Sequence, residues 1–348
     1  FPVMNIFHLL RVPAIICIAL CGQAFSKPIS ITIARSDGND FPGFATKADD
    51  SNIYISQFED GAGAAGYAFS SMKGISWGQP DDWKKAKEFW ERRDYAKATP
   101  AFKQAIEDYK GFALSKHPFM QDNIGAQAVF YYMECLRRTG KFAEMMEPYV
   151  QVQKVNLGGK WKDQIKLFQG WEHLAKGRWR PLSFMMETYE VKRSEIPGID
   201  DYTVAPNEMP LVGDLNFQHM AQVAYLRAIS TEKMAEELAE KLADLDPSAE
   251  ATREERITLG RDIGLMRSKA LTDYSRAFTI NYGSERGLAL RSMLGSLKLI
   301  EKMPRFKENY TMQREAYGIA VLFNSLSPAG LPTSLKHLLS KPVEPEEN

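Results

Sequence analysis

The side chains that could carry acid–base, nucleophilic or metal chemistry are dispersed along this chain of 348 residues. The five histidines lie far apart in the sequence, at His8, His117, His173, His219 and His337. The chain has neither an HExxH motif nor a CxxC pair, the short patterns that place metal ligands on one face. The sequence therefore predicts no catalytic residue, no metal site and no cofactor.

Composition indicates a folded protein without a strong electrostatic field. Apolar residues make up 44% of the chain, enough to bury a core, so global disorder is excluded. Lys plus Arg and Asp plus Glu both number 44, which gives a formal net charge of zero. Acids alternate with the bases in the basic and aromatic stretch 84–93, which is typical of a solvated helix face. We expect no nucleic-acid partner.

The N-terminus has the features of an export signal. Arg11 precedes the apolar run VPAIICIAL, and small residues follow at Gly22 and Ala24. We expect residues 1–24 to be a signal peptide and the protein to be periplasmic or secreted. Two alternatives remain: a buried strand, or a lipidated Cys21, which would add membrane contact. After cleavage Cys135 is the one remaining cysteine, and its apolar surroundings predict a core position.

Residues 27–78 predict a small antiparallel β module of three to five strands. Segments 29–34, 53–58 and 67–77 alternate with period two and are separated by turn-forming residues. The glycine-rich GAGAAG segment at 61–66 could suggest a phosphate loop. It lacks the following Lys-Ser/Thr pair and opens no helix, so a hairpin turn is the favoured interpretation.

From residue 81 the apolar period becomes helical. The expected helices are 81–93, 95–110, 121–139, 141–155, 162–176, 178–192, 214–229, 231–245, one or two within 249–281, 284–302 and 306–325. The Pro- and Gly-rich segment 193–213 predicts an insertion. Residues 327–348 predict a frayed tail. The expected units are thus hairpins over 81–192 and 214–326.

A similar sequence pattern recurs at residues 89–106, 136–152 and 174–189. Each copy breaks at a turn and then places an aromatic residue, namely Tyr95, Phe142 or Trp179. The spacing Tyr95, Ala98, Phe102, Ala105 resembles the second helix of the tetratricopeptide repeat, and Gly170 with Gly177 and the closing Leu245-Asp246-Pro247 are similar to other positions of that family. The pattern is intact in the first hairpin and degenerate in the later ones.

The resemblance implies a superhelix of helix pairs whose first helices line a concave face. The side chains that it assigns to partner binding on that face are Trp83, Lys87, Trp90, Phe130, Glu134, Arg137, Arg138 and Trp171, with Gln127, Gln164 and Leu167 beside them. One alternative is that Trp90, Phe130 and Trp171 pack between hairpins. Another is that Arg137 and Arg138 satisfy the dipole at the end of their helix.

These observations favour an exported, non-enzymatic scaffold that binds a peptide or protein partner, in an envelope assembly. A self-assembling structural subunit is the first alternative, and the oligomeric state is left open. An envelope enzyme with an unrecognised active site is the second alternative.

Overall fold

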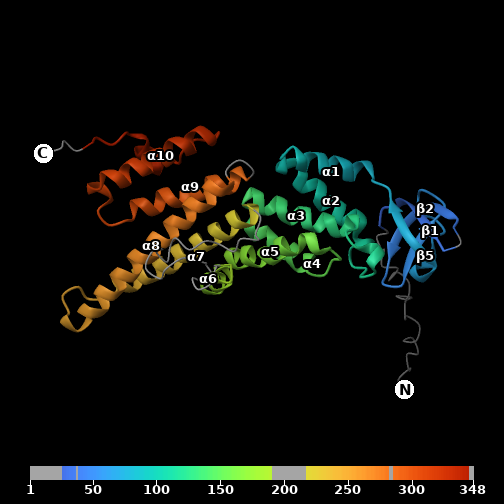
Figure 1. The fold of residues 1–348 in the computed structure, drawn as a ribbon, viewed down its shortest axis with the longest axis horizontal. Coiled ribbons are helices and arrows are strands. Elements are labelled where there is room, and N and C mark those ends of the chain that lie inside the picture. The colour runs from blue at the N-terminus through green and yellow to red at the C-terminus, as the bar shows by residue number, and fades with distance from the viewer. Residues whose placement is uncertain (1–25, 37, 190–216, 282–284, 345–348) are drawn as a thin grey trace, which may run out of the picture.

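The computed structural model describes residues 26–36, 38–189, 217–281 and 285–344. The chain forms an elongated molecule with a small sheet at one end and helices along the rest of its length (Figure 1). This arrangement confirms the predicted fold class, a mostly helical protein preceded by an antiparallel β module. The expected signal peptide (1–24) and insertion (193–213) lie outside the described residues.

Within the described residues, five strands form one antiparallel sheet in the order β4–β3–β2–β1–β5. They are β1 (Ile29–Arg35), β2 (Asp40–Ala48), β3 (Asn52–Ser56), β4 (Ala65–Ala68) and β5 (Met72–Trp77). Alternation in β1 buries Ile29, Ile31 and Ile33 on one face of the sheet. The GAGAAG segment runs through the turn between β3 and β4 into β4, so the hairpin interpretation is confirmed.

The sequence prediction missed β2, although it is the middle strand. It contains Pro42 and Gly43, residue types that are depleted in strands. Pro42 pairs with Thr32 in the ladder to β1. A Cβ at Gly43 would lie 2.5 Å from the Ile55 side chain. Glycine is required there because β3 approaches closely, and this requirement interrupts the alternation.

Helices fill the rest of the described chain. Their bounds are α1 (Asp81–Glu91), α2 (Tyr95–Ala113), α3 (Ile124–Thr139), α4 (Met146–Val152), α5 (Lys162–Ala175), α6 (Trp179–Glu187), α7 (Phe217–Ala243), α8 (Arg253–Asn281), α9 (Arg286–Glu301) and α10 (Tyr310–Leu326). A short 3₁₀ turn, Phe142–Met145, precedes α4. Over 81–189 the helices follow one another in the contacting pairs α1–α2, α3–α4 and α5–α6, which we call the three hairpins.

The three hairpins close with the same left-handed turn. The φ angles of Arg93, Gly140 and Gly177 are 60°, 77° and 64°. Each of these residues donates its N–H to the carbonyl three residues earlier, and the next N–H reaches the carbonyl five residues earlier. Glycine adopts this conformation freely, whereas a residue with a Cβ loses about 1–2 kcal/mol. Arg93 is therefore the strained member of the set.

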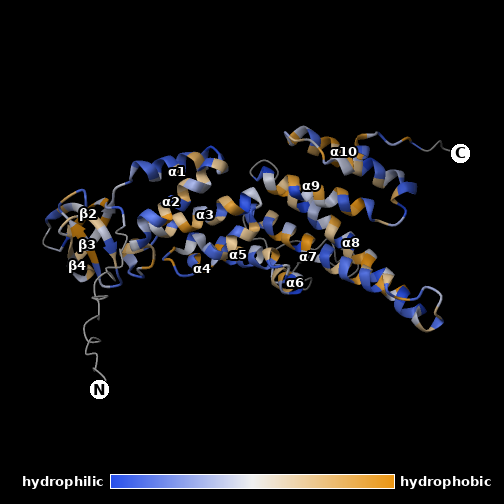
Figure 2. Ribbon diagram, turned by 180° about the vertical axis from the view of Figure 1, so that it is seen from behind, coloured by the Kyte–Doolittle hydropathy of each residue, from blue (hydrophilic) through white to orange (hydrophobic). Residues whose placement is uncertain are grey.

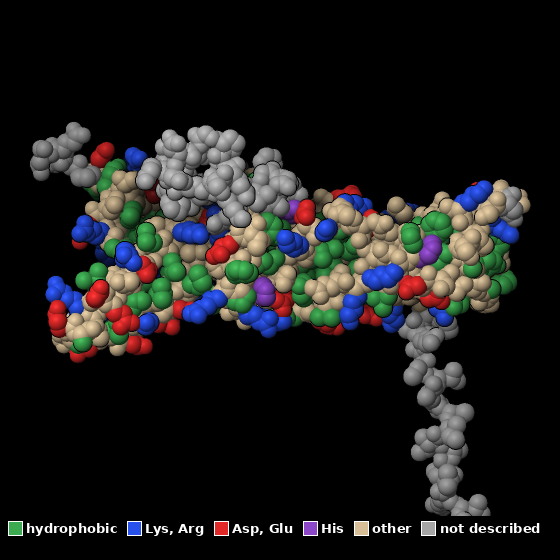
Figure 3. All heavy atoms as spheres, turned by 60° about the horizontal axis from the view of Figure 1, so that its bottom comes forward, with side chains coloured by type: hydrophobic (Ala, Val, Ile, Leu, Met, Phe, Trp, Pro, Cys, Tyr) green, Lys and Arg blue, Asp and Glu red, His purple; other side chains and the backbone are tan. Residues whose placement is uncertain are grey.

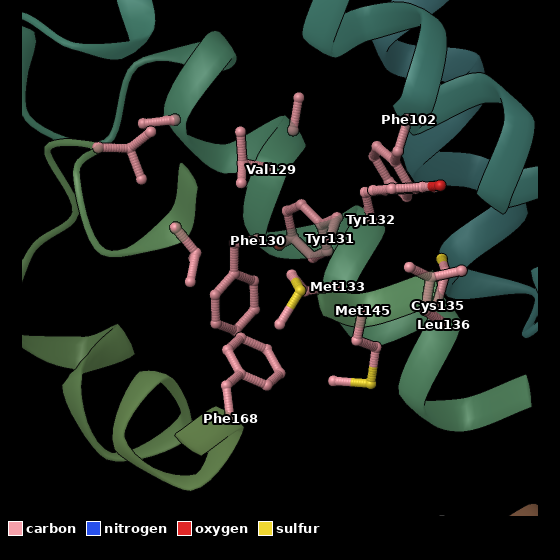
Figure 4. Packing of buried hydrophobic residues seen from close by; sticks show 14 of the residues in the cluster. Phe102, Val129, Phe130, Tyr131, Tyr132, Met133, Cys135, Leu136, Met145 and Phe168 are labelled. Atoms are coloured by element: carbon pink, nitrogen blue, oxygen red, sulfur yellow. The ribbon is translucent and has the colours of Figure 1, made fainter. Parts of the chain in front are cut away.

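Helix α3 lies at the centre of the hairpin array. Nearly all of its side chains are buried, including Phe130, Met133, Cys135 and Leu136. Figure 4 shows Phe130 pointing towards Phe168, with Met133 beside them. Hydrophobic positions accordingly follow α3 on more than one face, which is expected of a helix surrounded by others (Figure 2). Cys135 is a core residue, as predicted, and burial raises the pKa of its thiol to about 12.

The C-terminal half departs from the prediction in two places. Residues 214–245 were expected to form two helices, but α7 is continuous from Phe217 to Ala243 and lies alongside α8. The Ser230 hydroxyl donates to the Arg227 carbonyl within the helix instead of ending it. The tail was expected to fray, yet Leu331, Leu335 and Leu338 pack into a core shared with α9 and α10.

Candidate functional site

The side chains that the resemblance assigns to a concave binding face are mostly buried. Five of them expose 5% or less of their surface: Trp83, Phe130, Glu134, Arg137 and Trp171. Gln164 and Leu167 are buried as well, and Lys87, Trp90, Gln127 and Arg138 are partly buried. The structure corrects the prediction for the buried residues, because a partner cannot reach them without unpacking the helices.

Phe130 and Trp171 instead pack between hairpins, which is the alternative that the sequence left open. The Phe130 ring lies 5.5 Å from that of Phe168, centroid to centroid. Trp171 stacks between Phe142, at 5.0 Å, and Tyr225, at 5.6 Å. Both residues therefore stabilise the array through aromatic packing rather than presenting a surface.

Trp83, Lys87 and Trp90 gather around one residue of the second hairpin, Tyr131. The Trp83 and Trp90 rings lie 6.1 and 5.1 Å from the Tyr131 ring. The Lys87 ammonium donates to the Tyr131 hydroxyl at 2.6 Å, and burial lowers the pKa of Lys87. These contacts attach α1 to α3.

Arg137 links α3 to α9 through a buried charge cluster. Its guanidinium donates to both carboxylate oxygens of Glu134, at 2.7 and 2.8 Å, and to both of Glu285, at 2.8 and 2.9 Å. Arg138 adds a bond to Glu134 at 3.1 Å. Burial would raise the pKa of Glu134, but the two arginines outweigh burial and hold that pKa well below its usual range. Arg137 therefore does more than complement the dipole of α3.

An open pocket lies beside this cluster, and we call it the arginine pocket. Its volume is about 300 Å³, and it is lined by Arg93, Tyr95, Arg138, Glu285, Arg286, Gly287 and Leu288. The Arg138 guanidinium donates to the Tyr95 hydroxyl at 3.1 Å and lies 4.9 Å from the Trp90 ring centroid. Of the predicted binding residues, Arg138 lines this pocket, and Trp90 contacts the Arg138 guanidinium.

A second cavity, the α1–α2 groove, has a volume of about 460 Å³ and a largely apolar lining. The lining residues are Asp82, Lys85 and Phe89 of α1 and Ala96, Lys97, Pro100, Ala101, Gln104, Ala105 and Asp108 of α2. The groove exists because α2 presents small residues where α1 presents Phe89. Of the alanines in the repeat pattern, Ala105 lines the groove and Ala98 does not.

One end of the α1–α2 groove is acidic. Asp82 accepts hydrogen bonds from the Lys27 ammonium at 2.6 Å and from the Tyr109 hydroxyl at 2.9 Å. Asp108 lies beside Asp82 in the lining and accepts from the Gln104 amide at 2.8 Å. Burial opposes ionisation of Asp82, but the bonds from Lys27 and Tyr109 prevail and lower its pKa. This end therefore carries negative charge at neutral pH.

The segment Gly74–Gly78 has the GxSxG spacing of a nucleophile elbow, a match that the prediction of no catalytic residue did not weigh. That motif places its serine on a sharp turn between a strand and a helix. Ser76 lies within β5 instead, paired with Thr32 of β1. The geometry is that of an ordinary strand and does not present Ser76 as a nucleophile.

On the face drawn in Figure 3, Lys and Arg side chains are interspersed with Asp and Glu. Across the described ranges, no helix is long and apolar enough to cross a membrane. In that same part of the chain, no group of three or more His, Cys, Asp or Glu is placed to hold a metal ion.

Comparison with protein families, curated proteins and solved structures finds no match to this chain.

Proposed function

We propose that this protein is a non-enzymatic scaffold that binds an amphipathic helix of a protein partner in the α1–α2 groove. The observation that carries the proposal is an apolar groove on the first hairpin of a helical array, lined within the described residues by α1 and α2 alone. Binding sites are concave and mostly apolar with a few polar groups, and this groove has that form, so we assign the partner to it.

The shape and charge of the groove favour a helix as the occupant. The groove follows α1 from Asp82 to Phe89, a length of about 10 Å or two helical turns. Asp82 and Asp108 line one end of the groove, and Lys27 pairs with Asp82, so two carboxylates stand against one ammonium there. The N-terminus of a helix, or a basic side chain in its first turn, complements such an end. Apolar side chains of the partner helix would fill the space between Phe89 and Ala101.

The test is a variant that blocks the groove. Ala101→Glu places a carboxylate in the apolar floor, and a partner that docks there would have to bury it unpaired. We expect at least a tenfold loss of affinity, which corresponds to about 1.4 kcal/mol. The partner is first recovered from an extract of the source cells with the full chain, and its affinity for each variant is then measured by titration.

Lys103→Glu is the matched control, because it introduces the same residue on α2 outside the groove lining. Equal partner affinity for both folded variants would contradict the proposal. A second copy of the chain is the rival occupant. It predicts a concentration-dependent dimer in sedimentation that Ala101→Glu dissociates, and this result would replace the scaffold with a self-assembling subunit.

We further propose that the protein is exported and cleaved after Ala24. Ser26 already belongs to the fold, because its hydroxyl accepts the Gly111 N–H at 2.6 Å. Cleavage there would leave that contact intact. Mass spectrometry of the native protein is expected to find Phe25 at the N-terminus. A native chain that retains residues 4–24 would refute this, and one that begins at a lipidated Cys21 would indicate membrane anchoring.

A further inference from the structure

A third cavity lies where the β module meets the first hairpin, and we call it the sheet–α1 pocket. It is lined by residues of β1, β2, the turn after β3 and the linker into α1. Its volume is about 390 Å³, within the range of about 300–1,000 Å³ that is usual for small-molecule sites. We propose that this pocket binds a neutral saccharide. The inference goes beyond the proposed scaffold function, since it concerns a second site with its own class of ligand.

The floor of the pocket is the solvent face of the sheet. Ser30 of β1 and Phe44 of β2 lie opposite each other in the ladder, so both side chains are on the same face. β1 and β2 are interior strands, and each is paired with a neighbour on both sides. A ligand on this floor meets side chains rather than a free strand edge, so the pocket is not suited to adding an extended peptide as a further strand.

The wall of the pocket is the linker between β5 and α1 (Figure 1). The Gly78 N–H donates to the Ser30 carbonyl at 2.7 Å, and a Cβ at Gly78 would come within 2.7 Å of that oxygen. Glycine therefore allows the linker to lie against β1. Pro28 and Pro80 also line the pocket, and their rings fix the backbone φ angle. The pocket is thus formed before a ligand arrives, which lowers the entropic cost of binding.

The charged side chains of the pocket are largely paired with one another. The Lys27 ammonium pairs with Asp82 at 2.6 Å, and Asp81 pairs with Lys84, which is outside the lining, at 2.9 Å. No large excess of either sign remains, so an ion would gain little in this pocket. A sugar hydroxyl both donates and accepts, and it can bond to a carboxylate oxygen beside an existing ion pair.

Three further polar groups are available to a ligand. Among the described residues, the Ser30 hydroxyl and the side chains of Glu59 and Gln79 have no hydrogen-bond or ion-pair partner. They line the pocket together with Phe44. The face of an aromatic ring carries partial negative charge, which attracts the polarised C–H groups of a sugar ring. An aromatic ring combined with amide, carboxylate and hydroxyl groups therefore matches a saccharide, which has apolar ring faces and hydroxyl edges.

Saturation-transfer NMR with the full chain tests for sugar binding, and calorimetric titration then gives the affinity. The probes are the neutral disaccharides maltose, cellobiose, lactose and chitobiose, with digalacturonate as an acidic counterpart. We expect saturable binding of at least one neutral disaccharide. Digalacturonate should bind more weakly, because Glu59 lines the pocket without a cation to balance it.

Two lining variants and one control make the result specific. Phe44→Ala removes the aromatic ring and should weaken binding by about tenfold. Gln79→Ala removes an amide from the exposed linker, outside the sheet, and should weaken binding by about fivefold. Phe184→Ala is the matched control on α6, where 74% of the residue is exposed, and should leave the affinity for the sugar unchanged.

The proposal is overturned if none of the neutral disaccharides binds saturably, or if digalacturonate binds as tightly as they do. Full sugar affinity in both Phe44→Ala and Gln79→Ala would overturn it as well. Loss of affinity for the protein partner in Phe44→Ala, without any sugar binding, would assign the pocket to that partner instead. The groove is judged separately by Ala101→Glu, so this inference can fail while the scaffold proposal stands.

Discussion

Replacing Arg137 with alanine should lower the free energy of unfolding by about 3–5 kcal/mol. Arg137 is fully buried and donates four hydrogen bonds to two carboxylates. Its removal would leave Glu134 and Glu285 buried with only the longer contacts from Arg138, at 3.1 and 3.5 Å, and would weaken the link between α3 and α9. Urea unfolding monitored by circular dichroism measures the change.

Acid should reduce the difference between the variant and the wild type. The folded-state pKa of Glu134 is lowered, so its ionised form stabilises the wild type above the unfolded pKa of about 4.5. That contribution is lost as the pH falls through the folded pKa, whereas alanine at 137 removes the part that comes from Arg137 at every pH. Arg138→Ala is the control, with a smaller expected loss because this side chain is partly exposed and its bonds are longer. Equal losses of unfolding free energy for Arg137→Ala and Arg138→Ala would contradict the central position of Arg137 in the charge cluster.

Phe102→Ala should destabilise the protein by about 3–5 kcal/mol. Phe102 has no exposed surface, stacks on Tyr131 at 5.1 Å and meets the edge of Trp83 at 5.6 Å. Its aromatic neighbours thus come from both hairpins, Trp83 from the first and Tyr131 from the second. Truncation would leave a cavity at the joint between the two hairpins.

Thermal unfolding of Phe102→Ala and Lys103→Ala side by side checks this prediction. Lys103 is the adjacent, exposed position on α2, so its truncation should have little effect. A shift for Phe102→Ala no larger than that for Lys103→Ala would mean that the packing of the first hairpin differs from the structure.

Local patterns predicted most of the fold because they act over a few residues. The hairpin turns at Arg93, Gly140 and Gly177 were found from the break in helical period and the aromatic residue that follows. β2 was missed because Pro42 and Gly43 interrupt its local strand pattern. The close approach of β3 requires the glycine, and Pro42 is paired with β1. The continuity of α7 depends on packing against α8, which no local signal around Ser230 reveals.

The candidate sites were less predictable because they depend on long-range contacts. Arg137 and Glu285 are separated by 148 residues, so neither the ion-pair cluster nor the pocket beside it follows from local spacing. The concave-face residues were assigned from a family resemblance. That assignment did not anticipate that α9 would pack against the end of α3, although the sequence had left open that aromatic residues pack between hairpins.

Site-specific photocrosslinking tests the scaffold proposal most directly. A photoreactive amino acid replaces Gln104, on the rim of the α1–α2 groove, and separately Lys103, the next residue on α2 but outside the lining. With the recovered partner bound, we expect crosslinks from position 104 that map to one helical segment of the partner, and none from position 103. Crosslinks from 103 alone, or from neither position while the partner remains bound, would contradict the groove as the binding site.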